Sequence, residues 1–286
     1  MLFGFTPLAV VAIRSCLAVL LLFLFLLIFR RGYLYIYPLG ALGCILAGVV
    51  NGVGSILYYT ALSRLNASVG QLLYSFYPLF VALWLFLDRQ PISHMTLIRL
   101  ILTVPGIFLL IGSSSSQVDL PGAAMMIGAA ALYALHLLIN QRVLYDVPSP
   151  TVTFYTLLAM AVTVTAAFLV FRPQLLPVSA VWQPLVLLGV ITFISRLTLF
   201  MGVKHLGGIQ TALIGLGELL ITVALAIIWL GESLAPVQWI GAILLSTNIL
   251  LAAFDKTPPQ QRKGKGFLSW LNPPPLQMSN IPFHDQ

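Results

Sequence analysis

Two of the ionisable residues inside the long apolar segments of this chain, a glutamate and an arginine, can do chemistry that most membrane-embedded residues cannot. Glu218 is the only carboxylate within these segments, near the middle of one, and Arg196 lies within the preceding one. An ionisable group at bilayer depth needs a partner, a proton or a water-filled cavity. The carboxylate can exchange a proton, and the arginine can hold it or bind an anionic solute. The alternative is a buried ion pair that only fixes helix packing.

A second group of candidates lies on one face of an apolar segment. Gly70, Gln71, Tyr74 and Tyr77 recur at helical spacing. Pro78 follows and removes the backbone hydrogen bond to the carbonyl near Tyr74, which is tolerated where a helix lines a cavity. We therefore predict a pocket face, with a small-residue packing seam filled by tyrosine as the alternative.

Further polar residues occur in two other segments. Asn51 lies among glycines that favour close helix packing, and Tyr58 follows on the same segment. Tyr133 and His136 form a stripe at i and i+3, and a histidine can titrate near neutrality. Structural roles for Asn51 and His136 remain open at this stage. The predicted substrate and ion pathway comprises Glu218, Arg196, Asn51, Tyr58, Gln71, Tyr74, Tyr77, Tyr133 and His136.

Two other arginines lie closer to the ends of their segments. Arg14 and Arg99 are placed where a long side chain can extend to the lipid headgroups. We predict that both anchor their helices at the membrane surface.

The composition is typical of a protein embedded in a lipid bilayer. Of 286 residues, 60% are hydrophobic and 7% are charged, and the mean hydropathy is +1.02. The formal charge of +7 does not indicate nucleic acid, because basic residues of a membrane protein mostly record topology. Cys16 and Cys44 fall within apolar segments, which argues against a disulfide framework or a cysteine metal site. Nucleotide-binding and metallopeptidase motifs are absent, so we expect no enzyme, no cofactor and no metal.

The apolar segments predict an all-α membrane protein with nine transmembrane helices. We place them at about 7–29, 38–62, 67–87, 93–112, 120–140, 151–171, 182–203, 208–230 and 236–254. One side of this arrangement receives nine Lys and Arg residues and the other receives two. The richer side should be cytoplasmic, which predicts a multi-pass protein of the inner (plasma) membrane with a cytoplasmic C-terminus and Met1 outside.

An internal repeat appears at an offset of about 142 residues. The segment 84–93 aligns with 226–235, and Phe29-Arg30 aligns with Phe171-Arg172 on the opposite side of the membrane. This pattern predicts a ten-helix, five-plus-five inverted repeat that lacks its first helix. Either the start lies upstream or that helix has been lost.

The repeat divides the chain into three parts. We assign 1–116 to a first half of four helices, 117–254 to a second half of five, and 255–286 to a tail. The tail is proline-rich and carries the basic cluster Arg262-Lys263-Gly264-Lys265. These features predict a disordered cytoplasmic extension.

Three stretches resemble the EamA-type members of the drug/metabolite transporter superfamily. They are 6–18 with its arginine, Tyr59-Thr-Ala-Leu-Ser63 with the small-residue helix after it, and 229–241 with its Gly-Glu turn. The resemblance covers about residues 6 to 254. It implies ten helices in two inverted halves around a central pocket. The chain departs from this pattern in its missing first helix, in Asp88-Arg89-Gln90 at the first-half turn, and in Thr156 opposite Arg14.

These observations predict a secondary transporter that exports a small organic metabolite, such as an amino acid, by alternating access. Proton coupling through Glu218 is a hypothesis. The alternative is a truncated or regulatory membrane protein without transport activity. The expected partners are a small-molecule substrate and the lipid bilayer, without nucleic acid, and the sequence leaves a homodimer open.

Overall fold

The computed structural model describes residues 6–65, 67–111, 119–171, 183–230, 235–251, 254–255 and 266–271. In this part of the chain the secondary structure is helical, as predicted. Six helices are long and apolar enough to cross a membrane, and three shorter apolar helices accompany them. The prediction of an all-α membrane protein is therefore confirmed.

The helices coincide with the nine predicted spans, two of which are interrupted. They are α1 (Pro7–Phe29), α2 (Pro38–Leu62), α3 (Ala67–Tyr74), α4 (Tyr77–Leu87), α5 (His94–Ile111), α6 (Leu120–Val143), α7 (Ser149–Phe171), α8 (Gln183–Leu206), α9 (Gly208–Gly215), α10 (Gly217–Leu230) and α11 (Pro236–Leu251). Two short 3-10 turns are η1 (Arg31–Leu34) and η3 (Ser269–Leu271). Proline in the first turn of α1, α2, α6 and α11 marks where these helices begin, because its missing N–H has no partner to lose there.

The third and eighth spans are broken near their centres. The first break separates α3 from α4 at Ser75 and Phe76, because Pro78 has no N–H to donate to the carbonyl of Tyr74. The second separates α9 from α10 at Leu216, between two glycines. The two breaks lie at nearly equivalent positions of the predicted repeat. Each exposes backbone groups that a cavity can solvate.

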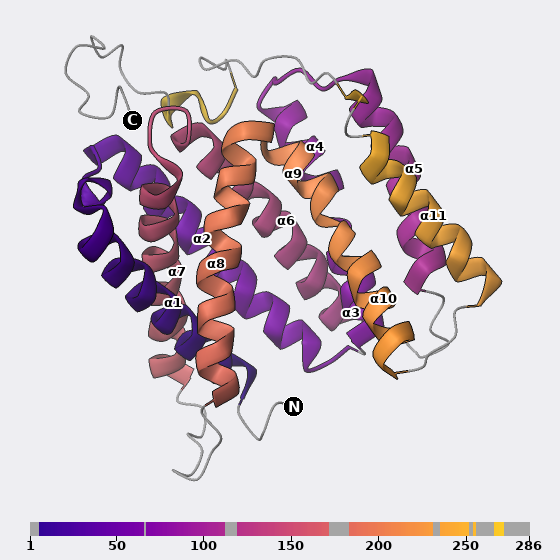
Figure 1. Cartoon of the computed structure of the whole chain (residues 1–286), viewed down its shortest axis with the longest axis horizontal. Helices are drawn as coiled ribbons and strands as arrows, with labels where there is room; N and C mark the ends of the chain where they lie inside the picture. Colours follow the sequence, from indigo (N-terminus) through magenta and orange to yellow (C-terminus); the bar gives the residue numbers. More distant parts are fainter. Residues whose placement is uncertain are drawn as a thin grey trace.

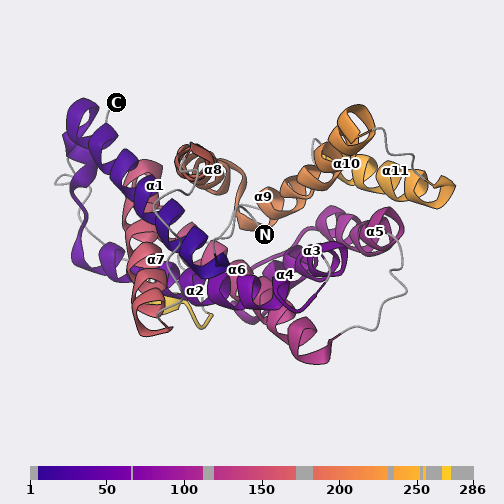
Figure 2. The ribbon, with the colours of Figure 1, turned by 90° about the horizontal axis from the view of Figure 1, so that it is seen from below.

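The helices form an open bundle (Figure 1). At one side α1 packs against α7 and α8, while α2 lies against α6 and α7. At the other edge α5 and α11 form a pair, and α9 with α10 runs diagonally from α8 toward this pair, as the view from below shows (Figure 2). Small residues permit the close packing: a methyl group at Gly48 of α2 would lie 2.5 Å from the carbonyl oxygen of Thr156 in α7.

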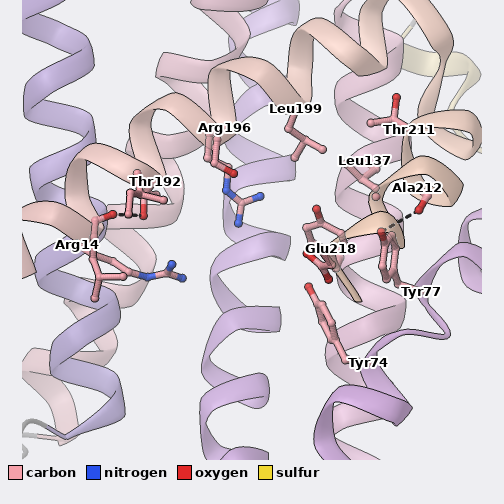
Figure 3. Close-up of a pocket in the computed structure, with 15 residues that line it drawn as sticks. Arg14, Tyr74, Tyr77, Leu137, Thr192, Arg196, Leu199, Thr211, Ala212 and Glu218 are labelled. Atoms are coloured by element: carbon pink, nitrogen blue, oxygen red, sulfur yellow. Dashed lines mark hydrogen bonds between the residues drawn. The ribbon is translucent and has the colours of Figure 1, made fainter. Parts of the chain in front are cut away.

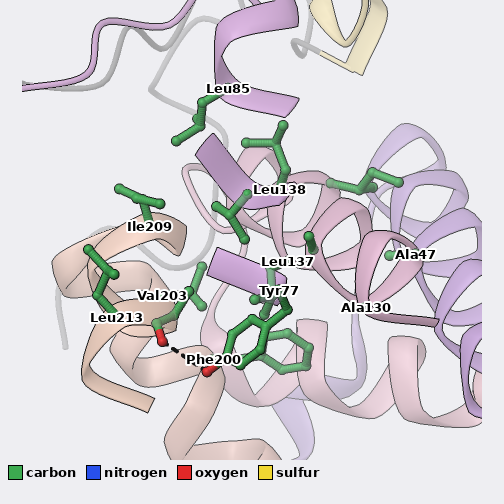
Figure 4. Packing of buried hydrophobic residues seen from close by; sticks show 14 of the residues in the cluster. Ala47, Tyr77, Leu85, Ala130, Leu137, Leu138, Phe200, Val203, Ile209 and Leu213 are labelled. Atoms are coloured by element: carbon green, nitrogen blue, oxygen red, sulfur yellow. Dashed lines mark hydrogen bonds between the residues drawn. The ribbon is translucent and has the colours of Figure 1, made fainter. Parts of the chain in front are cut away.

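The largest apolar core lies toward the end of the bundle that we predict to be cytoplasmic, and Figure 4 shows part of its packing. There α4, α6, α8 and α9 bring together side chains that include Leu85, Leu138, Phe200, Val203 and Leu213, all nearly inaccessible to solvent. This packing closes that end of the bundle. Large apolar side chains are exposed around the outside, as expected for contact with lipid tails.

Polar contacts reinforce the same end. Asp88 and Arg142 form an ion pair whose side chains are almost wholly buried. The backbone N–H of Gly208 donates to Oε1 of Gln141 at 2.5 Å, which joins the start of α9 to the end of α6. Asp88 also accepts a hydrogen bond from the backbone N–H of Leu268 at 3.0 Å.

The tail differs from the predicted disordered extension where it is described. Gly266–Leu271 form a turn that ends in η3, and Leu268 and Leu271 are each only 3% exposed. These leucines insert into the large core, and Phe267 packs beside Trp84. Burial of two leucines and the bond to Asp88 offsets the entropy of ordering this segment.

Arg99 does not extend to the headgroups, which corrects the expectation of an anchor. Its side chain is fully buried and forms an ion pair with Asp255 at 3.2 Å. Its Nε donates to the carbonyl and side-chain oxygens of Asn248 at 3.1 Å, and Nη1 donates to Gln210. Burial alone would raise the pKa of Asp255, but hydrogen bonds from Ser93 and from residues that include Gln210 hold that pKa below its usual value. This network joins α5, α9 and α11.

Several sequence-based predictions lie outside the described residues. They include the boundary at 116/117, Arg172 of the repeat, the Gly-Glu turn at 231–232 and the basic cluster at 262–265.

Candidate functional site

A cavity of about 320 Å³ lies between helices of the two predicted halves. Its walls come from α1, the end of α3, and α4, α6, α8, α9 and α10 (Figure 3). It is lined by Arg14, Tyr74, Tyr77, Tyr133, Leu137, Leu188, Ile191, Thr192, Ser195, Arg196, Leu199, Thr211, Ala212, Gly215 and Glu218. Both helix breaks border it, at Tyr74 and Gly215. The volume suits a small solute.

Glu218 occupies the first turn of α10, directly after the second break, and its side chain is exposed to the cavity. Gln71 of α3 donates to Oε1 of Glu218 at 3.5 Å, so a residue of the first half contacts a residue of the second. The cavity gives this carboxylate access to a solute or a proton at membrane depth, as its sequence position requires.

Arg196 lines the same cavity from α8. Its guanidinium lies over the ring of Tyr133, 5.8 Å from the ring centre. Among the described residues, the ion pairs involve Arg64, Arg99 and Arg142 and not Arg196. Glu218 and Arg196 therefore share a cavity, but they do not form the ion pair that the sequence suggested as one alternative.

Tyrosine rings form one wall of the cavity. Tyr74 lies 5.9 Å from Tyr77 and 5.7 Å from Tyr133 between ring centres. The hydroxyl of Tyr77 donates to the carbonyl of Ala212 at 2.8 Å, which ties α4 to α9. Tyr58 stacks edge-on against Tyr74 at 4.8 Å and supports this wall from behind. Gln71, Tyr74 and Tyr77 thus share the region that the sequence pattern indicated.

Four of the predicted pathway residues do not line the cavity itself. Gln71 and Tyr58 contact residues of its wall, whereas Asn51 and His136 are buried away from it. Asn51 is 4% exposed and donates to the sulfur of Met160 at 3.1 Å, so it joins α2 to α7. His136 is fully buried behind Tyr133, with Nδ1 2.7 Å from the side-chain nitrogen of Asn140. The surroundings of Asn51 and His136 therefore fit the structural role that the sequence allowed as the alternative to a pathway role.

The sequence-based prediction missed several cavity residues. Arg14 was expected at the headgroups, but it lines the cavity from α1 and lies over Tyr59 at 5.7 Å. Thr192 lies one helical turn before Arg196, and Ser195 lies directly before it, and both line the cavity from α8. Their spacing of i, i+3 and i+4 with Arg196 places all three residues on one helix face, and this pattern could have identified them from the sequence. Thr211 on α9 carried no such signal.

The side chains that line the cavity are suited to binding a polar solute. Within the described part of the chain, no cluster of three His, Cys, Asp or Glu residues is placed to hold a metal ion. The cavity instead combines guanidinium groups, one carboxylate and aromatic hydroxyls, which can orient a polar solute by hydrogen bonds and charge.

Comparison with known proteins finds relatives that are named as transporters. The chain is 25% identical over 236 residues to the uncharacterized transporter sll1319 of Synechocystis sp., covering 78% of this chain and 69% of the relative. It is 25% identical over 257 residues to the uncharacterized transporter YcbK of Bacillus subtilis, covering 83% and 80%.

A solved structure described as the crystal structure of a protein shares the fold, with a TM-score of 0.71, 18% identity and 88% of each chain covered. The sequence model of the EamA-like transporter family matches residues 1–112 and 120–254. Together these regions span most of the chain, so the protein belongs to the EamA-like transporter family.

Proposed function

We propose that the protein is a secondary transporter that moves a small organic metabolite across the inner membrane by alternating access. The main support is the cavity between the two predicted halves. Arg196 and Glu218 line it from one half, and Tyr74 and Tyr77 line it from the other. Transporters built from inverted repeats place their substrate sites at such an interface, often beside broken helices. The family membership supports transport as the activity.

In this proposal the packed core closes one end of the cavity, and the structure corresponds to one of the two states that alternating access requires. The packed layer around Phe200, Leu213 and Leu85 lies between the cavity and the predicted cytoplasmic end. The hydrogen bond from Tyr77 to Ala212 and the ion pair of Asp88 with Arg142 join helices in this layer. Opening toward the cytoplasm requires separating these contacts while the opposite end closes.

Proton coupling is assigned to Glu218 in this proposal. It is the one carboxylate among the residues that line the described cavity, and Gln71 contacts it from the other half. A carboxylate that changes its proton occupancy between two states can couple the proton gradient to solute movement. With this coupling, an inward proton gradient drives export.

The test is metabolite profiling of the medium and cytosol of cells that express the chain, compared with cells that express Glu218→Gln at equal membrane abundance. We expect a small polar solute to redistribute to the medium with the wild-type chain and to remain inside with the variant. If no solute redistributes although the folded protein is in the membrane, the transport proposal is wrong and a regulatory role replaces it.

A further inference from the structure

The cavity carries two positive charges and one negative charge. Arg14 from α1, Arg196 from α8 and Glu218 from α10 all line it. Figure 3 shows the two arginine side chains extending toward the side of the cavity on which Glu218 lies. The lining therefore has a formal charge of +1 when the carboxylate is ionised.

The two cavity arginines are only partly buried and differ in their partners from Arg99 and Arg142, which are buried in the protein. Arg99 and Arg142 each have a carboxylate partner, at Asp255 and Asp88. Neither Arg14 nor Arg196 is among the ion pairs of the described residues, and the buried Nε of Arg14 has no hydrogen-bond partner there. Each guanidinium lies over a tyrosine ring instead.

Guanidinium groups held at membrane depth without a carboxylate are costly unless a ligand supplies one. A planar guanidinium matches a carboxylate in a two-pronged hydrogen-bonded geometry. Glu218, on the opposite side, matches an ammonium group. The cavity thus offers places for two carboxylates and one ammonium.

We propose that the cavity binds an amino dicarboxylate, a solute with two carboxylates and one ammonium group and a net charge of −1. This inference rests on the proposed transport function and specifies its substrate class. A neutral amino acid would leave one guanidinium without a partner. A dicarboxylate without an ammonium group would leave Glu218 facing a like charge or requiring a proton. The volume of about 320 Å³ lies near the small end of ligand sites, which suits such a compact solute.

The test uses the purified full-length chain in proteoliposomes and counterflow of radiolabelled glutamate. The competitors are glutamate, glutamine, in which an amide replaces the second carboxylate, and glutarate, which lacks the ammonium group. We expect glutamine and glutarate to compete at least about tenfold more weakly than glutamate, because glutamine offers no second carboxylate to the arginines and glutarate offers no ammonium group to Glu218. Direct uptake of radiolabelled glutamine and glutarate is measured alongside.

Two variants assign the preference to the arginines. In Arg14→Gln and in Arg196→Gln the affinity for glutamate should fall by about 10- to 100-fold. In the variant that removes the partner of the second carboxylate, the affinity for glutamine should change little, so the preference for glutamate over glutamine narrows. In the variant that removes the partner of the carboxylate that both solutes share, both affinities should fall. Arg64→Gln is the matched control, because Arg64 pairs with Asp119 in an exposed position outside the cavity. It should leave the preference unchanged.

The outcomes separate this inference from the proposed function. Transport of glutamine at the efficiency of glutamate would overturn the substrate class and leave the transport function intact. If both arginine variants kept the wild-type preference for glutamate over glutamine, the proposed role of the arginines would be wrong. If the folded wild-type protein moves none of these solutes but moves another metabolite found by profiling, the substrate class alone is wrong. Failure to move any solute would overturn both.

Discussion

Replacing Glu218 by glutamine is expected to abolish solute accumulation driven by an imposed pH gradient. The amide keeps the size of the side chain and can still accept a hydrogen bond from Gln71, which contacts the carboxylate at 3.5 Å. It cannot exchange a proton, so the coupling of proton and solute movement is lost. Affinity for a solute with an ammonium group should also fall by about 10- to 100-fold, because a charge-assisted hydrogen bond is removed.

This prediction is checked by uptake into proteoliposomes over a range of internal and external pH. Glu218→Asp retains a carboxylate and should keep the pH dependence with a lower rate. Asp119→Asn is a suitable control, because that carboxylate caps the start of α6 and pairs with an exposed arginine away from the cavity. Wild-type pH dependence in Glu218→Gln would exclude Glu218 as the coupling group.

The second large effect is expected from the buried ion pair at the closed end. Arg142→Gln removes one partner of a pair whose side chains are at most 1% exposed and leaves the carboxylate of Asp88 without it. Breaking such a pair typically costs about 3–5 kcal/mol, which corresponds to a melting temperature lower by about 10 °C. Asp88 also accepts the N–H of Leu268, so the tail turn should loosen as well.

Thermal unfolding of the purified protein in detergent measures this effect. The double variant Asp88→Asn/Arg142→Gln should lose less stability than Arg142→Gln, since no uncompensated charge stays buried. Arg64→Gln should change stability by no more than about 1 kcal/mol, because its pair with Asp119 is exposed to solvent. A melting temperature of Arg142→Gln equal to that of Arg64→Gln would show that the buried pair contributes nothing to stability.

The sequence predicted most of the fold because lipid imposes simple rules. Long apolar segments must be helices in a bilayer, so the helix bounds follow composition. The break between α3 and α4 was also predictable, because Pro78 cannot donate the hydrogen bond that Tyr74 requires. The break at Leu216 has no proline and is marked only by flanking glycines, which are equally common where helices pack closely.

The site was harder to predict because it depends on which faces of distant helices meet. The position of Arg14 along its helix gave its depth but not its orientation, so the prediction of an anchor at the headgroups missed its place in the cavity lining. Arg99 and Asp255 are far apart in the chain, and Asp255 begins the tail whose composition predicts disorder. The turn at Gly266–Leu271 was concealed in the same way by the prolines and basic residues around it.

The most direct test of the central claim fills the cavity without changing its charges. Thr192 lines the cavity on α8 and is 8% exposed, whereas Thr198 lies on an exposed face of the same helix. Solute counterflow in proteoliposomes should fall by about tenfold or more in Thr192→Trp, because the indole occupies the binding space, and stay within about twofold of wild type in Thr198→Trp. Wild-type flux in a folded Thr192→Trp protein would mean that the solute takes another route and would contradict this account.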